Sequence, residues 1–97
     1  MTRASPTVHA ISGPLTFDSV PAIYAASRDW FGGTQGMTID LAEVSAADSA
    51  GLALLIEWLR SARHVGVTLR FANIPSQMQE LIRVNGLQDT LTNGQGG

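Results

Sequence analysis

The chain has 97 residues, 44% of them hydrophobic and 14% charged, which is the size and composition of one small globular domain with a single core. Its net charge of −2 gives no basic surface for nucleic acid, and the lack of cysteine excludes disulfides, thiolate nucleophiles and cysteine metal sites. The N-terminus lacks the apolar run of a secretory signal and the longest apolar run, residues 52–56, is too short to span a bilayer, so we expect a cytoplasmic protein without direct membrane insertion.

The first half of the chain alternates strand and helix signals. Residues 7–12 alternate weakly and stop at Gly13-Pro14, which predicts a strand closed by a turn, with a short edge strand before it. Apolar residues at three- and four-residue spacing over 20–31 predict the first helix. The glycine-rich residues 32–36 then break the chain, and residues 37–41 are apolar enough to form a central strand.

The second half continues the alternation. Residues 48–64 predict a second helix, residues 67–71 a strand with one face in the core, and residues 75–86 a third helix. This order implies parallel strands joined by helical crossovers, and the N-terminal strand pair adds an antiparallel edge, so we predict an α/β fold with a mixed sheet. Residues 92–97 are polar and glycine-rich, so we expect a flexible tail after a single domain over 1–91.

The most informative segment runs from the end of the central strand into the second helix. A strand containing Asp40-Leu41 is followed by Asp48-Ser49-Ala50-Gly51-Leu52, in which Asp48 can cap the helix and Ser49 exposes a hydroxyl at its start. This pattern resembles the signature of the STAS family, the domain shared by anti-anti-sigma factors and sulfate transporters. The resemblance extends from about Ile11 to Leu87 and, within the family, is closest to the MlaB-type branch of the Mla phospholipid ABC transporter.

This resemblance implies a fold and a partner. The fold is a single STAS domain with a mixed sheet of 4–5 strands and three helices packed on one face. The implied role is that of a non-catalytic regulatory subunit whose second helix and Asp48-Ser49 turn dock on the cytoplasmic, MlaF-like ATPase of the transporter, itself bound to a membrane permease. Such a transporter maintains outer-membrane lipid asymmetry, and the chain would lie at the inner membrane only through the complex.

The resemblance also leaves an alternative open. In an anti-anti-sigma factor, a serine kinase of the anti-sigma type phosphorylates the residue at the position of Ser49 and so releases the domain. Ser49 is therefore also a candidate phosphorylation site. The two interpretations differ in how Ser49 is used. A phosphorylation switch requires a kinase to reach the hydroxyl, whereas a constitutive subunit requires only a small side chain that fits the interface.

A helical wheel of residues 48–64 adds a candidate docking surface. It places Leu54 beside Glu57, opposite the core face, and Trp58 on the flank, so we expect both apolar side chains to be exposed. The simpler alternative is that Trp58 folds over the edge of the domain. With the family signature, the wheel gives these candidate partner-binding residues: Asp48, Ser49, Ala50, Gly51, Leu54, Glu57 and Trp58.

The sequence predicts no catalytic centre. His9 and His64 fall in different elements, and the carboxylates are scattered without the spacing of a metal site. The glycine-rich residues 32–36 join a helix to a strand, whereas phosphate loops run from a strand into a helix, and the chain has no lysine. We therefore expect no enzymatic activity, no cofactor and no metal.

Overall fold

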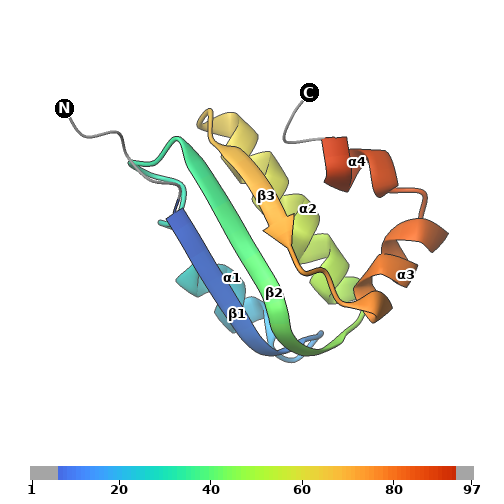
Figure 1. The fold of residues 1–97 in the computed structure, drawn as a ribbon. Helices are drawn as coiled ribbons and strands as arrows, with labels where there is room; N and C mark the ends of the chain where they lie inside the picture. The colour runs from blue at the N-terminus through green and yellow to red at the C-terminus, as the bar shows by residue number, and fades with distance from the viewer. Residues whose placement is uncertain (1–6, 94–97) are drawn as a thin grey trace.

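The computed structural model of the protein describes residues 7–93. Strands and helices alternate along most of this part of the chain (Figure 1). The elements are β1 (Thr7–Leu15), α1 (Val20–Ala26), β2 (Gly36–Ala47), α2 (Ser49–His64), β3 (Thr68–Ala72), α3 (Ser76–Val84) and α4 (Gln88–Asn93). The three strands form one sheet in the order β1-β2-β3, and β1 and β3 both run parallel to the central β2.

The sheet confirms the α/β class but not the predicted strand number. We expected a mixed sheet of 4–5 strands, whereas the described residues form three strands that are all parallel. Consecutive strands are parallel because each pair is joined by a helical crossover, α1 or α2. The short edge strand expected before β1 falls on residues 1–6 and lies outside the described residues.

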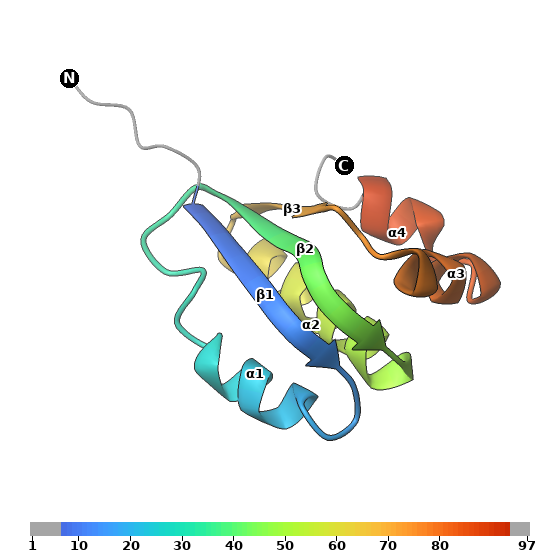
Figure 2. The ribbon, with the colours of Figure 1, turned by 60° about the horizontal axis from the view of Figure 1, so that its bottom comes forward.

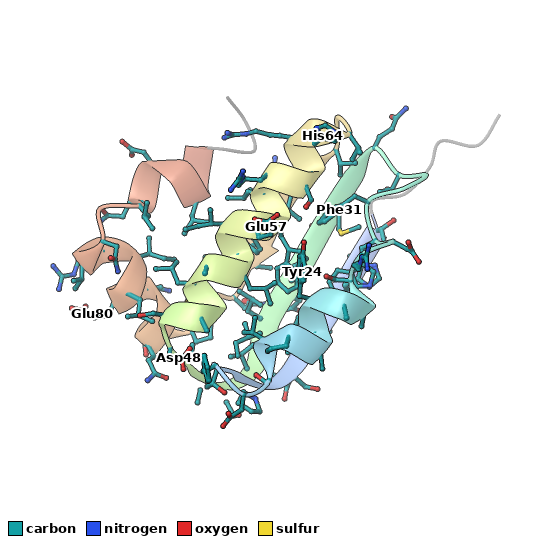
Figure 3. The ribbon with its side chains drawn as sticks, turned by 180° about the vertical axis from the view of Figure 1, so that it is seen from behind. Tyr24, Phe31, Asp48, Glu57, His64 and Glu80 are labelled. Atoms are coloured by element: carbon teal, nitrogen blue, oxygen red, sulfur yellow. The ribbon has the colours of Figure 1, made fainter. Side chains whose placement is uncertain are left out.

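The helices lie on one side of the sheet. Figures 1 and 3 show α2 lying along this side, with α1 beside it near β1 and with α3 and α4 beyond it near β3. Figure 2 shows the opposite side, which we call the open face, without a helix over the three strands. Val8, Ala10 and Arg70 are exposed along the strands, as expected for side chains that alternate between the two sides of a sheet.

The fourth helix, α4, was not predicted from the sequence. Its six residues contain one large apolar side chain, Leu91, which is buried in the core. A single apolar residue cannot show the three- and four-residue spacing of an amphipathic helix, so the sequence pattern did not predict a helix there. Residues 92 and 93 of the predicted tail belong to this helix, and residues 94–97 lie outside the described part.

The central strand β2 is longer than the predicted 37–41 and continues to Ala47. Its register against β1 shifts along the way, and Leu41 and Val44 both face the core although they are three residues apart. An extra residue in one strand of a pair resets the alternation of side chains in this manner. The longer strand pairs Ala47 with Leu15, so β1 and β2 end side by side where α2 begins.

Asp40, in the middle of β2, fixes the turn that follows β3. Its Oδ1 accepts hydrogen bonds from the Asn73 side-chain amide at 3.0 Å and from the Ala42 backbone N–H at 2.9 Å. The bond from Asn73, which has the larger effect, and the bond from Ala42 hold the pKa of the Asp40 carboxyl below its usual value. Asn73 has a φ of 56°, and asparagine tolerates this left-handed conformation better than most residues.

The predicted exposure of Leu54 and Trp58 is wrong. Leu54 is only 2% exposed and Trp58 only 1% exposed, and both belong to the hydrophobic core. The helical wheel assumed that α2 has one buried face, but α2 packs on the sheet, on α1 and on α3 and α4. The side assigned to solvent is the side that α1 covers.

Trp58 of α2 contacts the residues that follow α1. Its ring stacks on Trp30 at 5.5 Å between centroids, and Trp30 stacks on His9 of β1 at 4.0 Å. The Trp58 indole Nε1–H donates a hydrogen bond of 2.8 Å to the buried Ser27 Oγ, which in turn donates to the Tyr24 carbonyl at 2.8 Å. The bond matters because a buried N–H without a partner loses its hydration and gains nothing in return.

Replacing Ser27 with alanine should therefore destabilise the domain by about 1–3 kcal/mol, the cost of leaving a buried donor unpaired. Urea denaturation would measure this loss, with Ser45→Ala on an exposed position of β2 as the control that changes little. The loss should shrink in a Trp58→Phe background, which has no indole N–H to satisfy. An equal loss in both backgrounds would show that the Ser27 hydroxyl does not stabilise the domain through Trp58.

Candidate functional site

The candidate site is built around Asp48, the residue between β2 and α2. Its Oδ1 accepts hydrogen bonds from the N–H groups of Ala50 at 2.8 Å and Gly51 at 3.3 Å, which caps the start of α2 as predicted. Its Oδ2 accepts the N–H of Phe17 at 3.0 Å, and its own N–H donates to the Leu15 carbonyl at 3.2 Å. One side chain thus joins the turn after β1 to the first turn of α2.

The hydrogen bonds also set the charge of this side chain. The Phe17 N–H, followed by the N–H groups of Ala50 and Gly51, holds the pKa of the Asp48 carboxyl below its usual value, although partial burial opposes the shift. The carboxyl is therefore ionised at neutral pH. Its negative charge lies at the positive end of the α2 helix dipole, where it is favoured.

Gly51 brings the backbone of α2 against the end of β1. A Cβ at this position would lie 2.4 Å from the Leu15 carbonyl oxygen and 3.0 Å from the Leu15 Cβ. No side chain fits at 2.4 Å from a backbone oxygen, so glycine is required by space at this position. Gly51 is therefore a structural residue of the site, since it is buried beneath the turn that carries Ser49.

Ser49 is the exposed residue that these contacts present. It is the first residue of α2, and its hydroxyl makes no hydrogen bond with any of residues 7–93. The backbone around it is fixed by Asp48 on one side and by the contact of Gly51 with Leu15 on the other. The hydroxyl is thus free to meet another molecule from a fixed position.

Apolar side chains that the sequence analysis did not select surround this turn. Phe17 is 78% exposed, the highest value among the large hydrophobic residues described, and its backbone is bonded to Asp48. Tyr24 of α1 is 41% exposed and lines a shallow hollow of about 520 Å³ between α1 and α2. The sequence did contain a signal for Phe17, because this large aromatic residue stands in a turn and belongs to no apolar pattern that would place it in the core.

The structure divides the seven predicted site residues into two groups. Asp48, Ser49, Ala50 and Glu57 reach the surface around the turn or along the hollow beside it. The other three are buried: Gly51 against Leu15, Leu54 at the floor of the hollow, and Trp58 in the core. The candidate surface therefore consists of the Ser49 turn with Phe17 and the hollow, rather than of an exposed Leu54 and Trp58.

Two further observations bear on the chemistry of the described residues. Residues 7–93 contain no group of three or more His, Asp or Glu side chains placed to hold a metal ion. None of the helices in that range is both long and apolar enough to cross a membrane.

Comparisons with known proteins agree on the fold. A family model described as "Mlab, STAS domain" matches residues 1–93. The crystal structure of a sulfate transporter family protein from Wolinella succinogenes superposes with a TM-score of 0.71 at 15% identity, covering 96% of this chain and 79% of that one. The STAS domain of a SulP transporter from Vibrio cholerae superposes with a TM-score of 0.68 at 18% identity, covering 96% and 73%. At such identities the two structures show the fold alone, and no curated protein sequence matches the chain.

Gly51→Ala tests the close approach of α2 to β1. Helix propensity alone predicts a gain of up to about 1 kcal/mol from this change, but the contact with Leu15 should turn it into a loss of about 1–3 kcal/mol. Chemical denaturation measures the sign directly. Gly36→Ala is the matched control, because a Cβ there would meet its nearest neighbour at an ordinary 3.9 Å. A stabilised Gly51→Ala variant would contradict the close contact.

Asp48→Asn tests the bond between Asp48 and Phe17. Asparagine retains one accepting oxygen for the helix cap but places an NH₂ group where Phe17 N–H needs an acceptor. The folded-state pKa of Asp48 is lowered, so the stability advantage of the wild type should be complete at neutral pH and should decrease as the pH falls below about 3.9, the ordinary aspartate value.

Urea denaturation of both proteins between neutral pH and acid pH would show this convergence. Asp18→Asn, in the same turn but without a hydrogen bond to residues 7–93, should leave the free energy of unfolding at neutral pH nearly unchanged. A difference between wild type and Asp48→Asn that persists unchanged in acid would contradict the role of the charge.

Proposed function

The chain belongs to the STAS family, in its Mlab type, and from this membership we propose that it is a non-catalytic regulatory subunit that binds another protein through the Ser49 turn. The observation that carries the proposal is the exposed Ser49, whose hydroxyl is unbonded among residues 7–93, on a turn whose backbone is fixed by Asp48 and Gly51. The exposed Phe17 and the apolar hollow beside it add the contact area that a protein partner requires.

The proposed partner is the cytoplasmic, MlaF-like ATPase of a phospholipid ABC transporter that maintains outer-membrane lipid asymmetry. The description of the matching family model supports this choice. A rigid domain that binds only the assembled and competent ATPase increases the population of that state by its difference in affinity. The chain would then be cytoplasmic and would reach the inner membrane indirectly, through the ATPase and its permease.

One observation favours a second function. Ser49 is exposed and its hydroxyl has no hydrogen bond to the described part of the chain, so a kinase can reach it without unfolding the helix. In this alternative the chain is an anti-anti-sigma factor, and phosphorylation of Ser49 by an anti-sigma kinase controls its release. A phosphate would place about two negative charges beside the ionised Asp48, which would repel them.

The experiment that separates the two functions is purification of the tagged chain at its native level from the cells that make it. The proposal expects an ABC-type ATPase and its permease to co-purify, and expects the intact mass of the chain to carry no phosphate. Recovery of a serine kinase in place of the ATPase, with a stoichiometric phosphate on Ser49, would establish the alternative.

Ser49→Asp tests the turn itself. The first turn of a helix favours a negative charge, so the domain should remain folded, but a carboxylate without a cation in the interface should abolish capture of the ATPase. Ser49→Ala should retain most of the binding, since it only removes a hydroxyl. Capture assays alongside circular dichroism would measure both effects.

Thr68→Asp is the control for this change. Thr68 is also an exposed residue with a hydroxyl, and it begins β3 opposite Gly36, at the far end of β2 from Asp48. It should bind as the wild type does. Equal capture by Ser49→Asp and Thr68→Asp would remove Ser49 from the interface.

A further inference from the structure

Three hollows follow one another where α1 and the loop after it meet α2, and we call this line the α1–α2 seam. The hollow nearest Ser49, of about 520 Å³, lies between Tyr24 of α1 and Ala53 of α2, with Glu57 at its end. The hollow at the other end, of about 740 Å³, lies between Phe31 and His64 and also includes Glu57. A small hollow of about 120 Å³ shares Tyr24 with the first and Phe31 with the second, so it lies between them.

Figure 3 shows Tyr24, Glu57, Phe31 and His64 following one another along this seam. From Ala50 to His64 the seam runs along about 21 Å of α2, or about four helical turns. A partner segment on the seam would therefore lie beside the Ser49 turn at one end and beside the C-terminus of α2 at the other.

The end of the seam near Ser49 is apolar. Val20, Pro21 and Tyr24 form one wall, and the small side chains of Ala50 and Ala53 form the other. None of the seven residues of α1 is fully buried, so its apolar residues are only partly covered by the domain itself. Small residues on one wall and an aromatic ring on the other leave room for a bulky apolar side chain from outside.

The end near His64 is charged, and its charges are incompletely paired. Arg60 contacts Glu57 at 3.8 Å, a loose pair between exposed side chains, and the Arg28 guanidinium has no hydrogen bond or ion pair within residues 7–93. Asp29 lines the same hollow without contacting a cation there. Arg28 and Asp29 both lack a counter-charge among residues 7–93, but Arg28 also lines the small hollow in the middle of the seam, whereas Asp29 does not. Arg28 is therefore the unpaired group nearer the apolar end, and a guanidinium binds a carboxylate through two parallel hydrogen bonds.

We propose that the α1–α2 seam is the docking groove for an amphipathic helix of the partner protein, whose bulky apolar side chains fill the hollow beside Ser49 and whose carboxylate binds Arg28. This inference rests on the proposed function and adds the chemistry of the partner segment to it. A helix lying in an apolar groove is a common mode of peptide recognition. The length of the seam corresponds to a partner helix of about four turns.

Charge variants at neighbouring positions of the same hollow test the proposal, with capture of the co-purifying ATPase as the measurement. Arg28→Glu should weaken capture by about tenfold or more, because the introduced carboxylate would repel the carboxylate of the partner helix. Arg28→Lys should retain part of the binding. Asp29→Asn should bind as well as the wild type or better. Arg70→Glu is the control and should bind as the wild type does, because Arg70 is exposed on the open face and has no ion pair within residues 7–93.

Cross-linking identifies the segment that occupies the groove. The chain has no cysteine, so Ala53→Cys introduces a unique thiol into the apolar hollow for a photoreactive benzophenone maleimide. The cross-linked partner peptide should be helical, with large apolar residues and an Asp or Glu about two turns away. Ala22→Cys, at an exposed alanine of α1 that does not line the seam, should give little cross-linking.

The outcomes separate this inference from the proposed function. If the wild type captures no ATPase, the proposed function fails and the inference fails with it. If the wild type captures the ATPase and Arg28→Glu captures it equally, only the groove is wrong. Weaker capture by Asp29→Asn with normal capture by Arg28→Glu would mean a basic partner segment, and a cross-link from Ala53→Cys to a second copy of this chain would mean self-association. Either of these results overturns the proposal.

Discussion

The arrangement of the site depends on one ionised side chain, Asp48, that binds two separate parts of the backbone. One oxygen accepts the first free N–H groups of α2, and the other accepts the N–H of Phe17, in the turn after β1. The helix start, the aromatic residue beside it and the serine between them therefore occupy fixed relative positions. Gly51 also packs directly against Leu15, so α2 cannot move away from β1 without losing this contact.

A second polar contact fixes the other side of the candidate surface. α1 has no fully buried residue, yet it is held against α2 through Ser27, whose hydroxyl receives the Trp58 indole N–H inside the core. Val20 and Ile23 of α1 also pack against the core, while the other residues of this helix stay exposed and available for another protein. The surface around Ser49 thus has two walls, positioned independently by Asp48 and by Trp58.

The sequence predicted the parts of this structure that leave a local pattern. Asp48 as the cap of α2 and the alternation of strands and helices follow from short-range rules, and the structure has both. The position of Leu54 and Trp58 depends instead on what lies beside α2, and a helical wheel carries no information about a neighbouring helix. The same limit explains α4, whose single apolar residue, Leu91, has a role only because the core has a space for it.

Asp48 and Ser49, at the centre of the candidate site, could be predicted from the sequence, but the residues around them could not. Asp48 and Ser49 stand next to each other in a recognisable motif, but Phe17 and Tyr24 come from other segments. The Phe17 N–H is bonded to Asp48, and the Tyr24 carbonyl is linked to Trp58 through Ser27. The two tryptophans of the chain, Trp30 in the loop after α1 and Trp58 of α2, stack on each other, and Trp58 also lines the small hollow of the α1–α2 seam. The intrinsic fluorescence and near-ultraviolet circular dichroism of this protein therefore arise next to the surface proposed for docking. The unlabelled domain carries its own optical reporter of any partner that presses on α1.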